Sequence, residues 1–250
     1  GRWMAHFMRW AYPQTDGVVT ASKGVADDLA SVIGLEREGI EVVYNPIDIS
    51  HVTTLSKRPL QHPWYIDRSL PLIVAAGRLT RQKDYPMLLH AFALVRPHRP
   101  LRLIILGEGE ARGELEALVR KLGLGDDVAM PGFVDNPFAW MRLSSLYVLS
   151  SAWEGFGNVL VEAMACGTPV ISTDCPSGPA EILENGLWGR LVPVGDVKAL
   201  AEAIVATLDE SVYPDVGRRA QDFNVEKAVE GYLSVLEIPL PVHSNKGARV

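Results

Sequence analysis

The stretch EGFGNVLVEAMACGTPVIST, residues 154–173, places two glutamates eight positions apart around a Gly-Phe-Gly turn. Its pattern predicts a helix over 158–166 followed by a short apolar strand over 169–173. Helix packing gives no reason for the spacing of Glu154 and Glu162, because Glu154 stands before the helix begins. A ligand held between the two carboxylates would explain it, and the rest of the chain indicates which ligand.

Short apolar runs alternate with amphipathic stretches along the chain. The expected strands cover residues 17–21, 40–45, 71–77, 101–107, 127–132, 146–151, 169–173 and 189–194. The expected helices cover residues 22–33, 84–96, 110–122, 136–144, 158–166, 178–184, 197–208 and 225–236. Several strands are apolar on both faces, which is typical of a parallel sheet covered by helices. The alternation therefore predicts an α/β fold with a doubly wound, Rossmann-like parallel sheet.

The two ends of the chain differ from its middle. We expect residues 1–44 to be the end of a neighbouring domain with its connection, because they supply too few elements for a core. Residues 45–224 are predicted to form a complete domain. The stretch 55–71 is rich in proline and polar residues and is expected to be a surface excursion. Residues 225–250 are predicted to form a final helix and a disordered tail.

Composition excludes several classes of function. The 250 residues are 48% hydrophobic and 22% charged, as in ordinary globular proteins, and the net charge of −6 argues against a nucleic-acid binder. No apolar run reaches the length of about 18 residues that crosses a bilayer, and the first residues lack the pattern of a signal peptide. The two cysteines, Cys166 and Cys175, form no framework, so we expect a reducing cytoplasmic setting and no catalytic thiol.

Four loops follow the predicted strands at the edge where an open parallel sheet binds its ligand. They are GRLTRQK (77–83), GEGEAR (107–112), GFVDN (132–136) and SAWEGFGN (151–158). We expect them to converge on one crevice.

The first of these loops carries cations suited to a diphosphate. Gly77 allows the chain to turn at the strand end, and Arg78 and Lys83 then project over the crevice. Arginine binds phosphate through a planar fork and lysine through a point charge. The alternative is that both are solvated surface charges, and Arg81 is a rival cation in the same loop.

The second and third loops offer backbone to a flat group such as a nucleobase. Gly107 opens a Gly-x-Gly turn, but Arg112 stands where the dinucleotide-binding fingerprint requires its third glycine. Backbone groups beside Phe133 and Val134 could frame a base in the same way. Phe133 is equally compatible with a place in the core. After the third loop, Asn136 is expected to cap the helix that follows, with Pro137 in its first turn.

The fourth loop predicts an anion site. If the helix begins near Gly157 or Asn158, the backbone N–H groups of residues 156–159 lack partners within the helix, and the glycines allow a phosphate to approach. Glu154 can then lean over the bound group, and Glu162 can accept hydrogen bonds from sugar hydroxyls. The alternative is that Glu154 merely favours the helix N-terminus electrostatically and that Glu162 is a solvated helix residue. Against this, Glu162 is flanked by VLV and AMA, so it needs a partner.

Together these segments resemble a known family. The segments AAGRLTRQKDYPMLLHAF, LGEGEARGELEALVRKLGLGDDVAMPGFV and SSAWEGFGNVLVEAMACGTPVISTDCPSGPAEIL are similar to the C-terminal, donor-binding domain of family 4 retaining glycosyltransferases with the GT-B fold. The glutamate pair of that family falls on Glu154 and Glu162. The segment VVYNPID (42–48) resembles the stretch between domains that opens this domain. The likeness covers roughly residues 40–210, and only the end of the N-terminal domain is present.

The resemblance implies a role for each matching residue. Arg78, Lys83 and Glu154 would be catalytic, the first two by stabilising the leaving nucleoside diphosphate and the third by contacting the transferred sugar. Glu162 would bind the ribose hydroxyls, and Phe133, Val134 and the turn at Gly107 would frame the base. The implied donor-binding set is Gly77, Arg78, Lys83, Gly107, Phe133, Val134, Glu154, Gly155, Phe156, Gly157, Asn158, Val159, Leu160 and Glu162.

The resemblance also implies partners and setting. We expect a nucleotide sugar as donor, with UDP favoured, and a saccharide or lipid-linked acceptor bound mostly by the N-terminal domain. No cofactor or metal is expected, since no Asp-x-Asp motif occurs. Such enzymes work in polysaccharide or glycolipid biosynthesis, in the cytoplasm or peripherally at the inner face of the membrane. This chain alone is expected to bind donor but to transfer little or no sugar.

Three alternatives stay open at this point. A non-catalytic nucleotide-sugar-binding module would share the fold, but it would have little need for the full set Arg78, Lys83, Glu154 and Glu162. A nucleotide-sugar epimerase of the same fold is disfavoured by the spacing of the glutamates and the adjacent GFGN. A nicotinamide dehydrogenase is disfavoured most, because no dinucleotide fingerprint is present.

Overall fold

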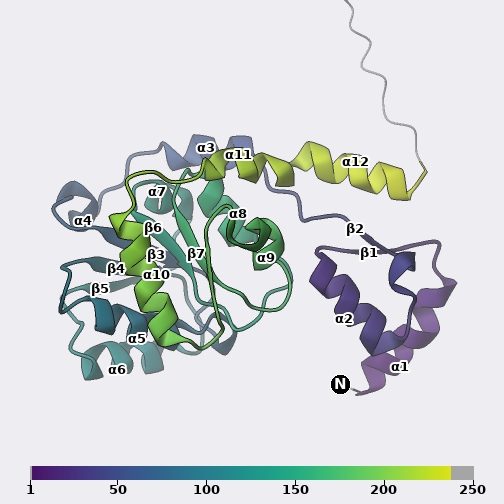
Figure 1. Cartoon of the computed structure of the whole chain (residues 1–250), viewed down its shortest axis with the longest axis horizontal. Coiled ribbons are helices and arrows are strands. Elements are labelled where there is room, and N and C mark those ends of the chain that lie inside the picture. The colour runs from purple at the N-terminus through teal and green to yellow at the C-terminus, as the bar shows by residue number, and fades with distance from the viewer. Residues whose placement is uncertain (1, 238–250) are drawn as a thin grey trace, which may run out of the picture.

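The computed structural model describes residues 2–237, with side chains from residue 6 onward. Its larger part is built on a parallel sheet with the strand order β5-β4-β3-β6-β7-β8 (Figure 1). These strands are β3 (Leu72–Ala76), β4 (Arg102–Leu106), β5 (Val128–Gly132), β6 (Leu146–Leu149), β7 (Val170–Thr173) and β8 (Arg190–Val192). The order reverses direction between β3 and β6, so the predicted doubly wound sheet is confirmed.

Helices cover both faces of this sheet. One face packs against α5 (Tyr85–Val95), α6 (Arg112–Lys121) and α10 (Val197–Asp209). The other packs against α3 (Ile49–Ser56), α7 (Pro137–Arg142), α8 (Asn158–Ala165) and α11 (Val216–Ala220). Side chains of β3 alternate between the two cores, with Ile73 and Ala75 in the first and Val74 and Ala76 in the second. This burial on both sides explains why the strand is apolar throughout.

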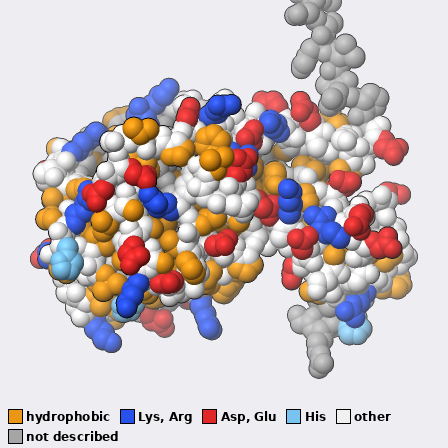
Figure 2. Space-filling model, in the orientation of Figure 1, with side chains coloured by type: hydrophobic (Ala, Val, Ile, Leu, Met, Phe, Trp, Pro, Cys, Tyr) orange, Lys and Arg blue, Asp and Glu red, His pale blue; other side chains and the backbone are white. Residues whose placement is uncertain are grey.

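The N-terminal elements form a smaller part beside the sheet. Two parallel strands, β1 (Val18–Thr20) and β2 (Ile40–Val42), pair with each other and accompany α1 (Arg2–Ala11) and α2 (Lys23–Ile33). A narrow waist separates this part from the larger one in Figure 2, and basic and acidic side chains are interspersed on the face shown. The division of the chain at residues 44 and 224 stays a prediction.

One expectation about the connection was wrong. The stretch 55–71 is not simply a surface excursion, because it contains α4 (Pro63–Ile66), whose Tyr65 is buried. The Tyr65 hydroxyl donates to the carbonyl oxygen of Trp140 at 2.8 Å, and the two rings meet edge to face. The helices α3, α4 and α11 were not predicted, because they are short and their polar residues obscure the apolar periodicity.

The ends of the described region complete the fold. The helix α9 (Pro179–Ile182) follows β7, and α12 (Val225–Val235) is the last helix of the described residues. The predicted disordered tail, 238–250, lies outside them. On α1, Phe7 and Trp10 are exposed. Within the described residues, no helix has the length and apolar character that a membrane span requires.

Candidate functional site

A cavity of about 620 Å³ lies at the C-terminal edge of the sheet, next to the point where the strand order reverses. A volume of this size is typical of a site for a small organic ligand. All four predicted loops contribute to it. Its lining consists of Asn45, Ala76, Gly77, Arg78, Lys83, Leu106, Gly107, Glu108, Phe133, Val134, Pro137, Glu154, Gly155, Phe156, Gly157, Asn158, Val159 and Glu162.

Close contact between two strand-end loops shapes the floor of the cavity. Gly107 follows β4 with φ 133°, and a Cβ atom there would lie 2.0 Å from the carbonyl oxygen of Gly77. Only glycine permits this approach. The Gly77 amide donates to Leu106, and the Gly107 amide to Gly132, so backbone hydrogen bonds continue the sheet into the loops.

The predicted cations take different positions. Arg78 is exposed at the cavity, and its guanidinium group makes no hydrogen bond within the described part of the chain. Lys83 ends a 3₁₀ turn, Arg81–Lys83, and its side chain is mostly buried. Arg81, the rival, lines a separate cavity with Asp84 and Glu110.

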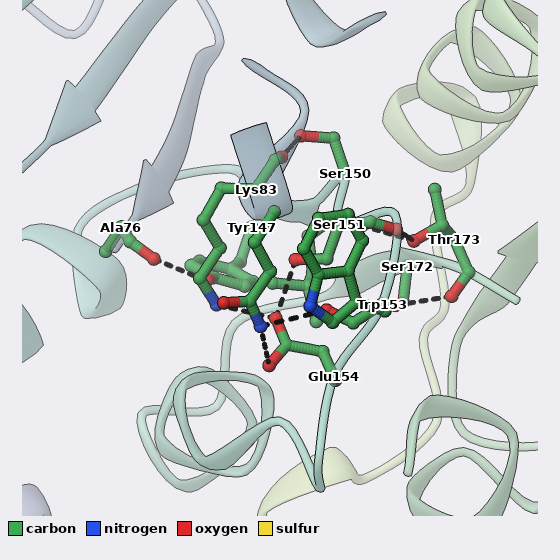
Figure 3. Close-up of polar contacts among 11 residues, drawn as sticks. Ala76, Lys83, Tyr147, Ser150, Ser151, Trp153, Glu154, Ser172 and Thr173 are labelled. Carbon is green, nitrogen blue, oxygen red and sulfur yellow. Dashed lines mark hydrogen bonds and ion pairs between the residues drawn. The ribbon is translucent and has the colours of Figure 1, made fainter. Parts of the chain in front are cut away.

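Lys83 and Glu154 form the central ion pair of the site (Figure 3). Their charged atoms lie 2.6 Å apart, and the two side chains are only 13% and 8% exposed. The Ser151 hydroxyl donates to the same carboxylate oxygen at 2.6 Å, and the Gln82 amide reaches the other oxygen at 3.4 Å. Without ligand, the two residues that were predicted to bind different groups of the donor therefore hold each other.

Glu162 lies deeper, on the first turns of α8. The residue is half-buried, and its carboxylate accepts no hydrogen bond from the described residues. Burial raises the pKa of its carboxyl group above the ordinary value, and the nearby Lys83 ammonium offsets part of that rise. A half-buried carboxylate without a donor is prepared to accept hydrogen bonds from a ligand.

The start of α8 provides the expected unpaired amides. Gly157 caps the helix in the left-handed conformation, and among the described residues none accepts a hydrogen bond from the backbone N–H groups of 156–159. The prediction for Leu160 differs from the structure. Its amide donates to the Gly157 carbonyl at 2.9 Å and its side chain is fully buried, so it does not line the cavity.

Two apolar side chains, Phe133 and Val134, also line the cavity. Phe133 is 73% exposed, which excludes its alternative place in the core, and Val134 lies beside it. Glu108 also lines the cavity, although it was not among the residues predicted from the sequence. Its carboxylate accepts from Arg112 at 2.6 Å, and Arg112 also donates to the Met130 carbonyl.

Asn45 is a second residue that the sequence interpretation missed. It follows β2 and donates from its side-chain amide to Asn158 Oδ1 at 2.9 Å, at the start of α8. The pattern of its segment, VVYNPID, indicates a connection between domains and gives no sign of a place in the cavity. Asn136 stands at the N-cap position of α7 with a proline in the first turn, as expected, but its side chain makes no capping hydrogen bond and donates to the Leu55 carbonyl.

Two further groups bear on the chemistry. Burial raises the pKa of the Cys166 thiol to about 12 and that of Cys175 to about 11, so both thiols are protonated at neutral pH. Within residues 2–237, no three His, Cys, Asp or Glu side chains cluster as metal ligands.

Comparison with known proteins identifies the family. Residues 70–210 match the family model described as glycosyl transferases group 1, and residues 1–51 match the model for glycosyltransferase family 4. The chain is 32% identical over 199 residues to N-acetylgalactosamine-N,N'-diacetylbacillosaminyl-diphospho-undecaprenol 4-alpha-N-acetylgalactosaminyltransferase of Campylobacter jejuni, covering 80% of this chain and 52% of that protein. It is 28% identical over 236 residues to N-acetyl-alpha-D-glucosaminyl L-malate synthase of Bacillus anthracis, covering 92% and 61%.

Solved structures agree. Anabaena Alr3699/HepE in complex with UDP superposes with a TM-score of 0.76 at 25% identity, covering 89% of this chain and 64% of that one. A glycosyltransferase from Rickettsia africae superposes with a TM-score of 0.79 at 17% identity, covering 95% and 68%. The chain spans 52–65% of the length of four curated relatives. With both family models matched and the doubly wound sheet in place, the chain belongs to the group 1, family 4 glycosyltransferases of the GT-B fold.

Proposed function

We propose that the protein transfers a hexosyl group from a nucleotide sugar, with UDP-sugar favoured, to a saccharide or lipid-linked acceptor with retention of configuration. The observation that carries this proposal is the composition of the cavity. The same space is lined by the cations Arg78 and Lys83, by the start of α8 with its unpaired amides, and by the carboxylates of Glu154 and Glu162. Cations beside carboxylates suit a ligand that joins a diphosphate to hydroxyl-rich sugars.

The lining suggests how the donor lies. The diphosphate sits against the start of α8, where unpaired N–H groups and the helix dipole favour an anion. Arg78 binds it through a fork of N–H donors, and Lys83 turns toward it from Glu154. Glu162 accepts the ribose hydroxyls, and the base lies over Phe133 and Val134. Glu154, released from Lys83, accepts hydroxyls of the transferred sugar.

Transfer requires stabilisation of the leaving group. The bond between the anomeric carbon and the diphosphate oxygen breaks, and its electron pair goes to that oxygen. The acceptor hydroxyl attacks the same face, and its proton passes to the departing phosphate. Arg78, Lys83 and the α8 amides stabilise the charge that develops on the diphosphate. Because these groups supply positive charge, we propose that no metal ion is needed.

The relatives support the donor and the setting. One solved relative, 25% identical, is a complex with UDP, and the Campylobacter relative is named for an undecaprenol-linked acceptor. We therefore propose UDP as the nucleotide, and a cytoplasmic location with peripheral contact to the membrane. Because the acceptor-binding contacts lie mostly in the N-terminal domain of such enzymes, we propose that this chain binds donor but transfers little sugar by itself.

Calorimetric titration with UDP-glucose, UDP-N-acetylglucosamine and GDP-mannose, each in the presence of EDTA, tests the proposal. We expect saturable binding of one UDP-sugar at one site per chain, with EDTA making no difference. Release of UDP should stay near the uncatalysed rate. A folded chain that binds none of the three sugars contradicts the proposal.

A further inference from the structure

A second set of contacts, outside the cavity, joins the N-terminal part to the turn before α8. The Glu181 carboxylate, on α9, accepts hydrogen bonds from the backbone N–H groups of Lys23 at 2.9 Å and Gly24 at 3.0 Å. The fully buried Ser22 donates its hydroxyl to the carbonyl oxygen of Gly155 at 2.7 Å. These bonds connect residues that lie more than 130 positions apart.

The bonds complete the start of α2, the helix that begins at Lys23. The first N–H groups of any helix lack partners within it. Here Ser22 satisfies one of them by accepting from Val25 at 3.2 Å, as an N-cap does. Glu181 satisfies the two before it and places a negative charge at the positive end of the helix. The start of α2 therefore depends on a carboxylate from the larger part.

Close packing fixes the same junction. A Cβ atom on Gly24 would lie 2.9 Å from the Ser177 Cα, so the start of α2 sits directly against the loop before α9. The Tyr44 ring stacks on Phe156 with ring centroids 5.3 Å apart, and burial together with the nearby Glu181 carboxylate raises the pKa of Tyr44 to about 12. Phe156 belongs to the turn before α8 and lines the cavity.

We propose that Glu181 is a positioning residue for the donor diphosphate. Glu181 does not line the cavity. It holds α2 in place, and α2 holds the Gly155 carbonyl through Ser22, so the amides of 156–159 stay aimed at the phosphate. Amides that are fixed in advance bind an anion better than amides that must be ordered on binding. This inference rests on the proposed function, because it needs the diphosphate to lie at α8.

Comparison of UDP and UMP binding by calorimetry tests the role. Glu181→Ala should lower the affinity for UDP about 10-fold, the loss expected when a charge-assisted anchor is removed. The affinity for UMP, which lacks the second phosphate, should fall less than about threefold. Glu181→Gln keeps one acceptor and should give an intermediate loss. Glu184→Gln is the matched control, because Glu184 pairs with Arg219 and not with α2, and it should leave both affinities unchanged.

The outcomes separate the two proposals. If the wild-type chain binds none of UDP, GDP and ADP, the proposed function fails and this inference fails with it. If the wild type binds UDP and a folded Glu181→Ala binds it equally well, the inference alone is overturned. Equal losses for UDP and UMP overturn it as well, because they indicate general support of the fold. If Glu181→Ala does not fold, Ser22→Ala removes the bond to Gly155 and serves in the same comparison.

Discussion

Lys83 Nζ lies 2.6 Å from Glu154 Oε1, and both side chains are almost removed from solvent. Replacing one partner of an ion pair that is this deeply buried costs stability, because the other charge then stays buried without its partner. The pair therefore holds the two side chains in place, and in the proposed function Lys83 turns from Glu154 toward the diphosphate of the donor.

The pair should show strong coupling in a double-mutant cycle. Lys83→Met should lower the free energy of unfolding by about 2–4 kcal/mol, because Glu154 is left with Ser151 and Gln82 as its donors. Adding Glu154→Gln should recover at least about 1 kcal/mol of that loss. Urea unfolding measures both.

An exposed pair offers the control for that cycle. Lys227 and Asp222 lie 3.0 Å apart but are 55% and 43% exposed, so Lys227→Met should cost less than about 1 kcal/mol. Additive effects of Lys83→Met and Glu154→Gln would contradict the proposed coupling.

In the protein without donor, ionisation of Glu162 should lower the free energy of unfolding. Its pKa is raised in the folded state, so the unfolded carboxyl ionises first as the pH rises past its ordinary value of 4.5. Stability is therefore lost from that pH upward until the folded carboxyl also ionises. Glu162→Gln should raise the melting temperature at pH 7.5 by roughly 1–3 °C and leave it unchanged at pH 4. Scanning calorimetry at both pH values checks this, and a lower melting temperature at pH 7.5 would show that the carboxylate has a stabilising partner.

Arg78 should not be replaceable by lysine. Arg78→Lys keeps the charge but loses the planar fork, so affinity for UDP should fall about 5- to 10-fold while the dependence of binding on salt stays the same. Stability should change by less than about 0.5 kcal/mol, because the side chain is exposed and unbonded within residues 2–237. Full retention of affinity would mean that Arg78 acts only as a general positive charge.

A methyl group added at Gly107 should disrupt its contact with Gly77 in the neighbouring strand-end loop. Gly107→Ala places a carbon 2.0 Å from the Gly77 carbonyl oxygen and should cost about 3 kcal/mol or more. Gly125→Ala, where the added carbon meets no atom within 4 Å, should change stability by less than about 1 kcal/mol. Urea unfolding of both variants makes the comparison, and similar values would mean that the loops can separate freely.

Sequence was sufficient to predict the sheet and the convergence of the four strand-end loops on one cavity. Every predicted strand is present, because strands buried on both faces are apolar throughout, and the crevice follows from where parallel strands end. The short helices α3, α4 and α11 were missed because their few turns carry too little periodicity to stand out.

The contacts between side chains were harder to predict than the positions of the loops that carry them. That Lys83 would pair with Glu154 depends on how the turn at 81–83 packs against the turn after β6, which no local pattern encodes. Asn45 was missed for the same reason, since its partner Asn158 lies 113 residues away. Contacts such as that between Glu181 and α2 depend on how two parts of the chain dock.

The most direct test of the proposed donor site is nucleotide titration of four chains: the wild type, Arg78→Ala, Glu162→Ala and Arg81→Ala. We predict that UDP binds the wild type at one site, and that Arg78→Ala and Glu162→Ala each weaken it about 10-fold or more. Arg81→Ala should bind like the wild type, because Arg81 faces a different cavity. Equal binding by all four folded chains would contradict the proposed site, because it would place the nucleotide outside the cavity at the end of β3 and β6.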